Sequence, residues 1–150
     1  MTKIGELGEN LVARWLETRG CLILARRWRC RSGEIDLIAR SEFSQTLMFI
    51  EVKTRGYGNW DADGLLAITP QKQAKLSLTA ELFLAKFPDL VRYPCRFDVA
   101  LVIYRRCQQV PIQESRDYCF KQSIKTGEPV YWGAYQLTLQ HYIKSAFDSV

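Results

Sequence analysis

Charged residues lie within two apolar stretches of this sequence. Asp36 is part of the stretch GEIDLIA, residues 33–39, and Glu51 and Lys53 end the apolar run that begins at Leu47. A carboxylate in a half-buried strand costs free energy unless it is paired or binds a cation. Carboxylate oxygens are hard ligands that suit Mg²⁺ or Mn²⁺. The pattern therefore indicates a metal site, although a cross-strand ion-pair cluster would produce the same residue types.

An acid on one strand followed by Glu-x-Lys on the next is the donor set required for metal-assisted hydrolysis of a phosphodiester. In this scheme Asp36, Glu51 and the backbone carbonyl of Val52 are the candidate ligands of the ion. Lys53 would orient the attacking water or offset the negative charge that develops in the transition state. These four residues form the predicted catalytic centre.

Two strands and a short loop must position this centre. Alternating and β-branched apolar residues predict strands at about 34–40 and 47–53, joined by a four-residue hairpin loop at 42–45. The register follows if Ser41 pairs with Thr46. A shift by one residue would move every side chain to the opposite face of the sheet.

This register predicts two facing pairs of charged residues. Asp36 faces Glu51, and Glu34 faces Lys53, so the four side chains form one polar cluster. Glu34 is then expected to lie behind the catalytic centre, where two roles are open: it would hold Lys53 in place, or it would only balance the charge of Lys53.

The remaining patterns predict one domain with an α/β fold. Strand 47–53, the next helix and strand 96–104 form a crossover unit, so those two strands should be parallel. Polar residues 105–128 read as a surface hairpin or long loop, and a helical spacing of apolar residues predicts a final helix. The expected elements are a helix at 4–19, a strand at 21–28, the two hairpin strands, a helix at 70–87 capped by Thr69, a strand at 96–104 and a helix at 137–148.

Three further charged residues are candidates for the centre. Glu9 shares the edge of the apolar face of the first helix, and on the residues alone we interpret it as a solvated helix residue. Lys72 lies in the first turns of the helix at 70–87, where the macrodipole offers a lysine no benefit, so an anion is its expected partner. Asp98 begins the strand at 96–104, where it could support the residues of the centre or be a plain turn residue, and the turn residue is the favoured interpretation.

Four arginines cluster between the first two predicted strands, interrupted by Trp28. Two interpretations remain open. The arginines protect an exposed edge strand, or they form a phosphate-binding ridge with an aromatic side chain for stacking. The cluster consists of Arg26, Arg27, Arg29 and Arg31.

The amino-acid composition excludes some classes of protein and favours others. The chain has 150 residues, a net charge of +5 and five cysteines without a CxxC pair. Reduced thiols and a cytoplasmic location are expected, because an odd cysteine count argues against a disulfide frame. No apolar run reaches the roughly 20 residues of a membrane span, so no membrane partner is expected. The positive charge favours a polyanionic partner only weakly.

Several motifs together resemble those of the YraN-like family of endonuclease-like proteins. The core of that family is similar to the PD-(D/E)xK nuclease superfamily, which includes archaeal Holliday junction resolvases. The resemblance covers residues 4–104, and the ordered pair GEIDLI and FIEVK is its most specific part. The motifs are GELGEN, GEIDLI, FIEVKTR, a Thr-Pro-x-Lys helix start and RFDVALV.

The resemblance implies a restriction-endonuclease-like αβββαβ core with a mixed central sheet, followed here by the predicted C-terminal helix in an extension at 105–150. It implies that Asp36, Glu51 and Lys53 occupy the active-centre positions. Glu9 corresponds to the helix-borne acid that completes the metal site, and Lys72 falls at a position where the family usually has lysine. Arg27 departs from the family pattern, which has asparagine in many relatives.

Two functions follow as hypotheses. The first is a nuclease that depends on Mg²⁺ or Mn²⁺ and hydrolyses phosphodiester bonds in DNA, with branched or structured DNA as candidate substrates. The second is a nucleic-acid-binding module that keeps the nuclease fold but has little or no activity and uses the arginines and Lys72 for phosphate contacts. A homodimer is an option, because symmetric cutting of two strands at a junction requires two active sites.

Overall fold

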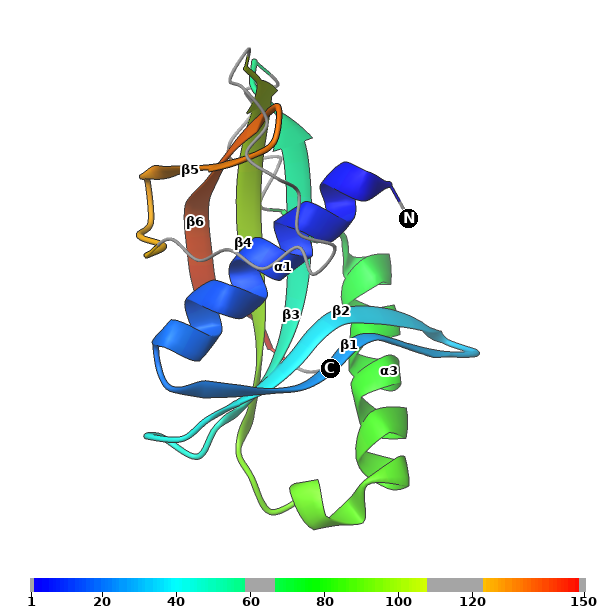
Figure 1. The fold of residues 1–150 in the computed structure, drawn as a ribbon. Coiled ribbons are helices and arrows are strands. Elements are labelled where there is room, and N and C mark those ends of the chain that lie inside the picture. Colours follow the sequence, from blue (N-terminus) through cyan, green and yellow to red (C-terminus); the bar gives the residue numbers. More distant parts are fainter. Residues whose placement is uncertain (1, 59–66, 108–122, 149–150) are drawn as a thin grey trace.

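A mixed β-sheet carries one helix on each face (Figure 1). The computed structural model describes residues 2–58, 67–107 and 123–148. The order of the first six of its main elements confirms the predicted αβββαβ core. In chain order the elements are α1 (Lys3–Thr18), β1 (Cys21–Cys30), β2 (Gly33–Ser41), β3 (Leu47–Gly56), α3 (Pro70–Lys86), a 3₁₀ turn η1 (Pro88–Leu90), β4 (Cys95–Arg106), β5 (Pro129–Trp132) and β6 (Tyr135–Phe147).

The six strands follow the order β1-β2-β3-β4-β6-β5 across the sheet. Strands β1, β2 and β3 form an antiparallel meander, and β4 lies parallel to β3, as the crossover through α3 requires. Strands β6 and β5 continue the sheet in antiparallel pairing beyond β4. The predicted α/β class with a mixed central sheet is confirmed.

Each helix covers its own hydrophobic core. The α1 side of the sheet buries Leu7, Leu11 and Leu16 against Leu37 and Ile50. On the other face of the sheet, α3 packs through a second set of apolar residues: Leu76, Ala80 and Phe83 meet Ile38, Phe49 and Phe97. Strands β2 and β3 are therefore covered on both sides, which explains their unbroken apolar runs at 37–39 and 47–50.

The start of α3 agrees with the prediction made from its sequence. Thr69 is extended, and its hydroxyl accepts a hydrogen bond of 3.1 Å from the backbone N–H of Lys72. Pro70 then occupies the first helical position, where a missing N–H costs nothing. The helix ends at Lys86, one residue before Phe87.

The predicted hairpin register is also confirmed. Leu37 faces Ile50, and Ile38 faces Phe49. The backbone N–H of Ser41 donates to the carbonyl of Thr46 at 2.9 Å.

The predicted C-terminal helix is wrong, because residues 135–147 form strand β6. The pairing of β6 with β4 has two irregularities, one between Leu101 and Val102 and one between Phe97 and Val99. Each irregularity inserts residues into β6, and Ser145 there has a positive φ of 50°. Inserted residues interrupt the two-residue alternation of a strand, so the apolar residues of this segment do not show the spacing of a regular strand.

The other predictions for this region have mixed outcomes. Arg105 and Arg106 extend β4, so the predicted hairpin or loop at 105–128 begins later than expected, and β5 begins directly after it at Pro129. Residues 108–122 lie outside the described residues. The described cysteines are free, as predicted, while Cys119 lies outside the described residues. In the described ranges no helix is long and apolar enough to cross a membrane.

A close contact between α1 and β3 determines the distance between the helix and the sheet. Gly8 is buried, and a Cβ atom at this position would overlap the Oγ1 atom of Thr54 and lie 3.2 Å from its Cβ and Cγ2 atoms. Only glycine lets the helix backbone approach the strand this closely. Gly8 therefore positions its neighbour Glu9 above β3.

We expect Gly8→Ala to lower the free energy of unfolding by about 1–3 kcal/mol, because overpacking outweighs the better helix propensity of alanine. Adding Thr54→Ala should recover a large part of the loss, because it removes the two side-chain atoms nearest to the new methyl group. Urea unfolding of both single variants and the double variant measures this coupling. A Gly8→Ala protein as stable as the wild type would contradict the packing argument.

Candidate active site

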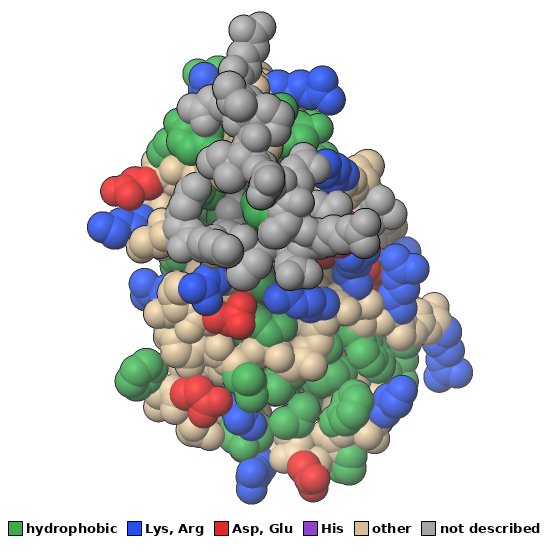
Figure 2. All heavy atoms as spheres, viewed as in Figure 1, with side chains coloured by type: hydrophobic (Ala, Val, Ile, Leu, Met, Phe, Trp, Pro, Cys, Tyr) green, Lys and Arg blue, Asp and Glu red, His purple; other side chains and the backbone are tan. Residues whose placement is uncertain are grey.

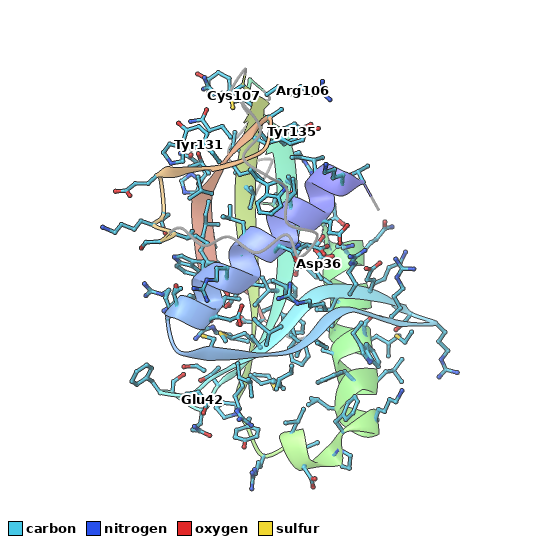
Figure 3. The ribbon with its side chains drawn as sticks, in the orientation of Figure 1. Asp36, Glu42, Arg106, Cys107, Tyr131 and Tyr135 are labelled. Carbon is cyan, nitrogen blue, oxygen red and sulfur yellow. The ribbon has the colours of Figure 1, made fainter. Side chains whose placement is uncertain are left out.

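Side chains from four elements converge where α1 crosses the hairpin and α3 begins. Glu9 comes from α1, Asp36 from β2, Glu51 and Lys53 from β3, and Lys72 from the first turn of α3. Figure 3 shows Asp36 beneath α1, near the start of α3. The electrostatic interactions of Asp36 with Glu9, Glu51 and Lys72 confirm that these groups are close together. The fold therefore brings the predicted residues of the centre into one cluster.

Asp36 is anchored to the neighbouring strand by its carboxylate. The backbone N–H of Val52 donates to its Oδ2 atom at 2.8 Å. Burial raises the pKa of Asp36 above its ordinary value, and Val52 and Lys72 oppose the increase. The carboxylate of Asp36 thus accepts a hydrogen bond from the N–H of Val52, which in a continued β-ladder would donate to a backbone carbonyl of the neighbouring strand.

Glu9 is buried, with only 5% of its surface exposed. The interpretation of Glu9 as a solvated helix residue, made from the residues alone, is therefore wrong. Loss of solvent, followed by the nearby charge of Asp36, raises the pKa of Glu9 to about 8. Arg27 on β1 opposes this increase, with its Nε atom 3.4 Å from the Oε2 atom of Glu9. The side chain points inward because Gly8 holds α1 close to the sheet.

Glu51 is the third carboxylate of the cluster. Burial, followed by the charge of Asp36, raises its pKa to about 7. The Nζ atom of Lys72 lies 3.7 Å from the Oε1 atom of Glu51, and this charge lowers the pKa in part. The anion expected beside Lys72 is therefore, in this structure, a side chain of the cluster itself.

The predicted pairing of Glu34 with Lys53 is wrong. The ladder between β2 and β3 ends at Leu37 and Ile50, because the carboxylate of Asp36 occupies the N–H of Val52 beyond that point. Lys53 instead donates from Nζ to the carbonyl of Ala67 at 2.7 Å, just before α3. Its pKa is lowered, mainly by burial and then by Arg55.

Glu34 turns away from Lys53 and toward the first strand. Its Oε2 atom lies 3.2 Å from the Nε atom of Arg29 on β1. It still acts on the cluster at longer range, because its charge raises the pKa values of both Glu9 and Asp36.

The predicted arginine cluster lies along an edge strand and the turn that follows it, and two of its members contact α1. Arg26 donates from Nη1 to Asn10 at 2.8 Å, while Arg27 turns toward Glu9 and also lies 3.6 Å from Glu6. β1 is the outermost strand on this side of the sheet, so the protected-edge interpretation applies to it. Arg31 is exposed in the β1–β2 turn.

Stacking of a base on Trp28 is not supported. The ring of Trp28 packs edge-on against Phe83 of α3, with ring centroids 5.3 Å apart, and belongs to the α3 core. Figure 2 shows lysine and arginine side chains spread over several parts of one face of the molecule. A phosphate-binding role of the arginines therefore rests on their charge alone.

Sequence reasoning missed the role of Arg27 as the partner of Glu9. Arg26 faces Leu37 and Trp28 faces Ile35 in the β1–β2 hairpin. Arg27 therefore falls opposite Asp36, and its φ of 47° turns the backbone at this point. The short turn after β1 would have revealed this register, whereas the positive φ has no signal in the sequence.

The donor set fits a divalent cation in its chemistry. Glu9, Asp36 and Glu51 provide several oxygen ligands, and the raised pKa values of Glu9 and Glu51 show that their negative charges are incompletely balanced. However, the described residues contain no group of three Asp, Glu, His or Cys side chains that is arranged to hold a metal ion. Mg²⁺ commonly binds through one or two carboxylates together with waters and substrate phosphates.

Comparison with known proteins decides the family. The model of the uncharacterised protein family UPF0102 matches residues 8–102, which is nearly all of the predicted core. The chain belongs to this family. The resemblance to the YraN-like family predicted from the motifs is thereby confirmed.

UPF0102 proteins of several cyanobacteria align with most of the chain. One from Trichodesmium erythraeum is 48% identical, with 95% of this chain and 87% of the relative covered. One from Synechocystis is 43% identical, with 98% and 99% covered. One from Thermosynechococcus vestitus is 52% identical over 71% of this chain and 85% of its own length. The first two of these relatives therefore align with the C-terminal extension as well as with the core.

In metal-free buffer, the raised pKa values predict that the protein becomes less stable as pH rises from about 4.5 to about 8. The folded chain keeps protons on Glu9 and Glu51 that the unfolded chain releases, so the free energy of unfolding falls with pH in this window. Below it both states are protonated, and above it the loss is complete. Urea unfolding in EDTA at several pH values measures the trend.

Glu9→Gln should raise the free energy of unfolding at pH 8 by about 1 kcal/mol or more, since one pKa unit corresponds to about 1.4 kcal/mol. At pH 4.5 the variant should match the wild type. Glu42→Gln, on the exposed β2–β3 hairpin, is the charge-matched control and should keep the wild-type trend. The expectation fails if Glu9→Gln shows the same pH dependence as the wild type.

Proposed function

We propose that this UPF0102 protein is a divalent-metal-dependent nuclease that hydrolyses phosphodiester bonds in DNA. The observation that supports it is the convergence of Glu9, Asp36 and Glu51 from three elements, with Lys53 and Lys72 beside them. The charge of Asp36 raises the pKa values of both Glu9 and Glu51, and such crowding of carboxylates is unfavourable for stability alone. Such perturbed groups are typical of functional sites.

Each residue has a role in this proposal. Asp36 and Glu51 bind the cation, with Glu9 and the carbonyl of Val52 as additional ligands. The cation would polarise the phosphate and lower the pKa of an attacking water. Lys53 is held at the edge of the cluster by the carbonyl of Ala67, and its lowered pKa suits a group that exchanges or directs a proton.

Lys72 contacts Glu51 in this structure, so cation binding would release its ammonium group. Its side chain is about half exposed, which leaves it free to contact a substrate phosphate. Lys72 thus changes its partner from a carboxylate to a phosphate when metal and substrate bind together. This exchange accounts for a lysine in the first turn of α3, where the helix dipole disfavours it.

Cleavage of linear, nicked and four-way DNA, with and without Mn²⁺ or Mg²⁺, tests the proposal. The wild type should cut at least one substrate only with metal, and Asp36→Asn should reduce the rate by about 100-fold or more through loss of a ligand charge. Asparagine can still accept the hydrogen bond from Val52, so the fold should survive. Glu42→Gln should retain full activity.

A second function is supported by one observation. Each carboxylate of the cluster already has a protein partner, and no described group is arranged for a metal. A nucleic-acid-binding module without chemistry would show the same pattern. It predicts DNA binding that persists in EDTA, weakens steeply with salt and occurs without cleavage on any substrate.

Thermal stability separates a metal site from a purely structural ion-pair cluster. Mn²⁺ should raise the melting temperature of the wild type at pH 8, with a gain of about 2.7 kcal/mol at 100 times the dissociation constant. Asp36→Asn should lose most of this gain, and Glu42→Gln should retain it. An unchanged melting temperature across a wide range of Mn²⁺ concentrations would contradict the proposed metal site.

A further inference from the structure

A pocket lies at the C-terminal end of α1, away from the carboxylate cluster. Its volume is about 260 Å³. Figure 3 shows Glu42 on the neighbouring β2–β3 hairpin, well away from Asp36. Along α1, the ten residues from Glu9 to Arg19 correspond to about 15 Å. The residues that define the character of the pocket are Trp15, Arg19, Cys21, Arg96, Tyr142 and Lys144.

Three cations line this pocket from three separate elements. Arg19 follows the end of α1, Arg96 lies near the start of β4, and Lys144 lies on β6. All three cations lie close enough to the thiol of Cys21, in the same pocket, to lower its pKa. Burial has the larger effect and raises the pKa of this thiol. The positive charges therefore converge on one space rather than pointing apart.

The carboxylate of Asp98 lies beside these cations, but it already has its hydrogen-bond partners within the chain. Asp98 is 1% exposed and accepts hydrogen bonds from Arg96, from the hydroxyl of Tyr142 at 2.6 Å and from the backbone N–H of Ser145 at 3.1 Å. It is thus a buried anchor of β6, and the prediction that it is a turn residue is wrong. Among the described residues, no carboxylate forms an ion pair with Arg19 or Lys144, so the pocket keeps a positive excess.

The end of α1 does not neutralise this excess. Carbonyl groups at a helix C-terminus carry partial negative charge when they lack partners. Here the carbonyl of Leu16 accepts from the N–H of Arg19, that of Glu17 from Gly20, and that of Trp15 from the hydroxyl of Thr18. These carbonyls are occupied within the chain.

The walls of the pocket are aromatic and rigid. Trp15 and Tyr142 lie in tilted contact with ring centroids 4.8 Å apart, and the Arg19 guanidinium sits 4.8 Å from the centre of the Trp15 ring. This cation–π contact holds the arginine over the pocket wall. Planar guanidinium groups bind phosphate oxygens in pairs, and a lysine adds a point charge.

We propose that this pocket binds a phosphate group, supplied by a small phosphorylated ligand or by a nucleic-acid strand. Its volume is slightly below the range for drug-sized ligands, which fits a mononucleotide or smaller. Arg19 and Lys144 bind the phosphate, Arg96 supports them from the buried Asp98, and the aromatic wall packs against the rest of the ligand. The proposal does not depend on nuclease activity, because no residue of the carboxylate cluster lines this pocket.

The test uses the full-length protein in EDTA and a double variant, Arg19→Gln with Lys144→Gln. Both side chains are exposed and lie outside the hydrophobic cores, so the fold should be retained. The control is Lys86→Gln with Arg106→Gln, which removes the same charge from the end of α3 and the far end of β4. Arg96 is left intact because its removal would leave Asp98 buried without its cation.

Calorimetric titration measures affinity for inorganic phosphate, a nucleoside monophosphate and a short single-stranded oligonucleotide. Wild type and control should bind at least one of these probes, and the Arg19/Lys144 variant should bind it about tenfold or more weakly, through loss of charge-assisted hydrogen bonds.

The probes distinguish the sources of the phosphate. Binding of phosphate or the monophosphate points to a small ligand, and oligonucleotide binding that free phosphate competes away points to a strand. The proposal is overturned if none of the probes binds at millimolar concentration, or if the double variant and the control bind equally well.

Discussion

The hydrogen bond from the backbone N–H of Val52 to the carboxylate of Asp36 organises the candidate site. It ends the β2–β3 ladder at Leu37 and Ile50 and lets the two strands separate on the side of α3. Without that separation, Lys53 would face Glu34 across the hairpin instead of reaching the carbonyl of Ala67. The Asp36 side chain thus replaces one hydrogen bond of the β2–β3 ladder, and this replacement determines which charged side chains contact each other.

The carboxylates of the cluster are held together at the expense of stability. Glu9 and Glu51 have raised pKa values because burial and a neighbouring carboxylate both disfavour their charged forms. Arg27 and Lys72 compensate only in part, from β1 and α3 respectively. The close packing of Gly8 against Thr54 prevents α1 from moving away and relieving the repulsion. The fold therefore maintains an arrangement that a cation would make favourable.

The two ends of α1 carry opposite electrostatic characters. Buried acids gather around its first half, and basic side chains surround a pocket at its last turn. Both regions include residues of α1, whose hydrophobic core contains Trp15 and Leu11. A nucleic-acid strand that follows α1 could place one phosphate at the cations and another at the carboxylates. This would link the proposed phosphate pocket to the proposed nuclease centre.

The sequence alone was sufficient for the αβββαβ core, the hairpin register and the start of α3 at Thr69 and Pro70. These features depend on local patterns, because strand alternation, loop length and a helix cap are set by neighbouring residues. The clustering of Asp36 with Glu51 followed from the same register.

Only the tertiary structure decided the burial of Glu9, the partners of Lys53 and Glu34, and the strand at 135–147. Burial of Glu9 depends on how closely α1 approaches β3, and the partners of Lys53 depend on where a ladder stops. The C-terminal segment lacks the spacing of a regular strand because bulges interrupt its alternation, and it is a strand because β4 offers it a free edge. Each of these outcomes depends on contacts between segments far apart in the chain, which no local pattern contains.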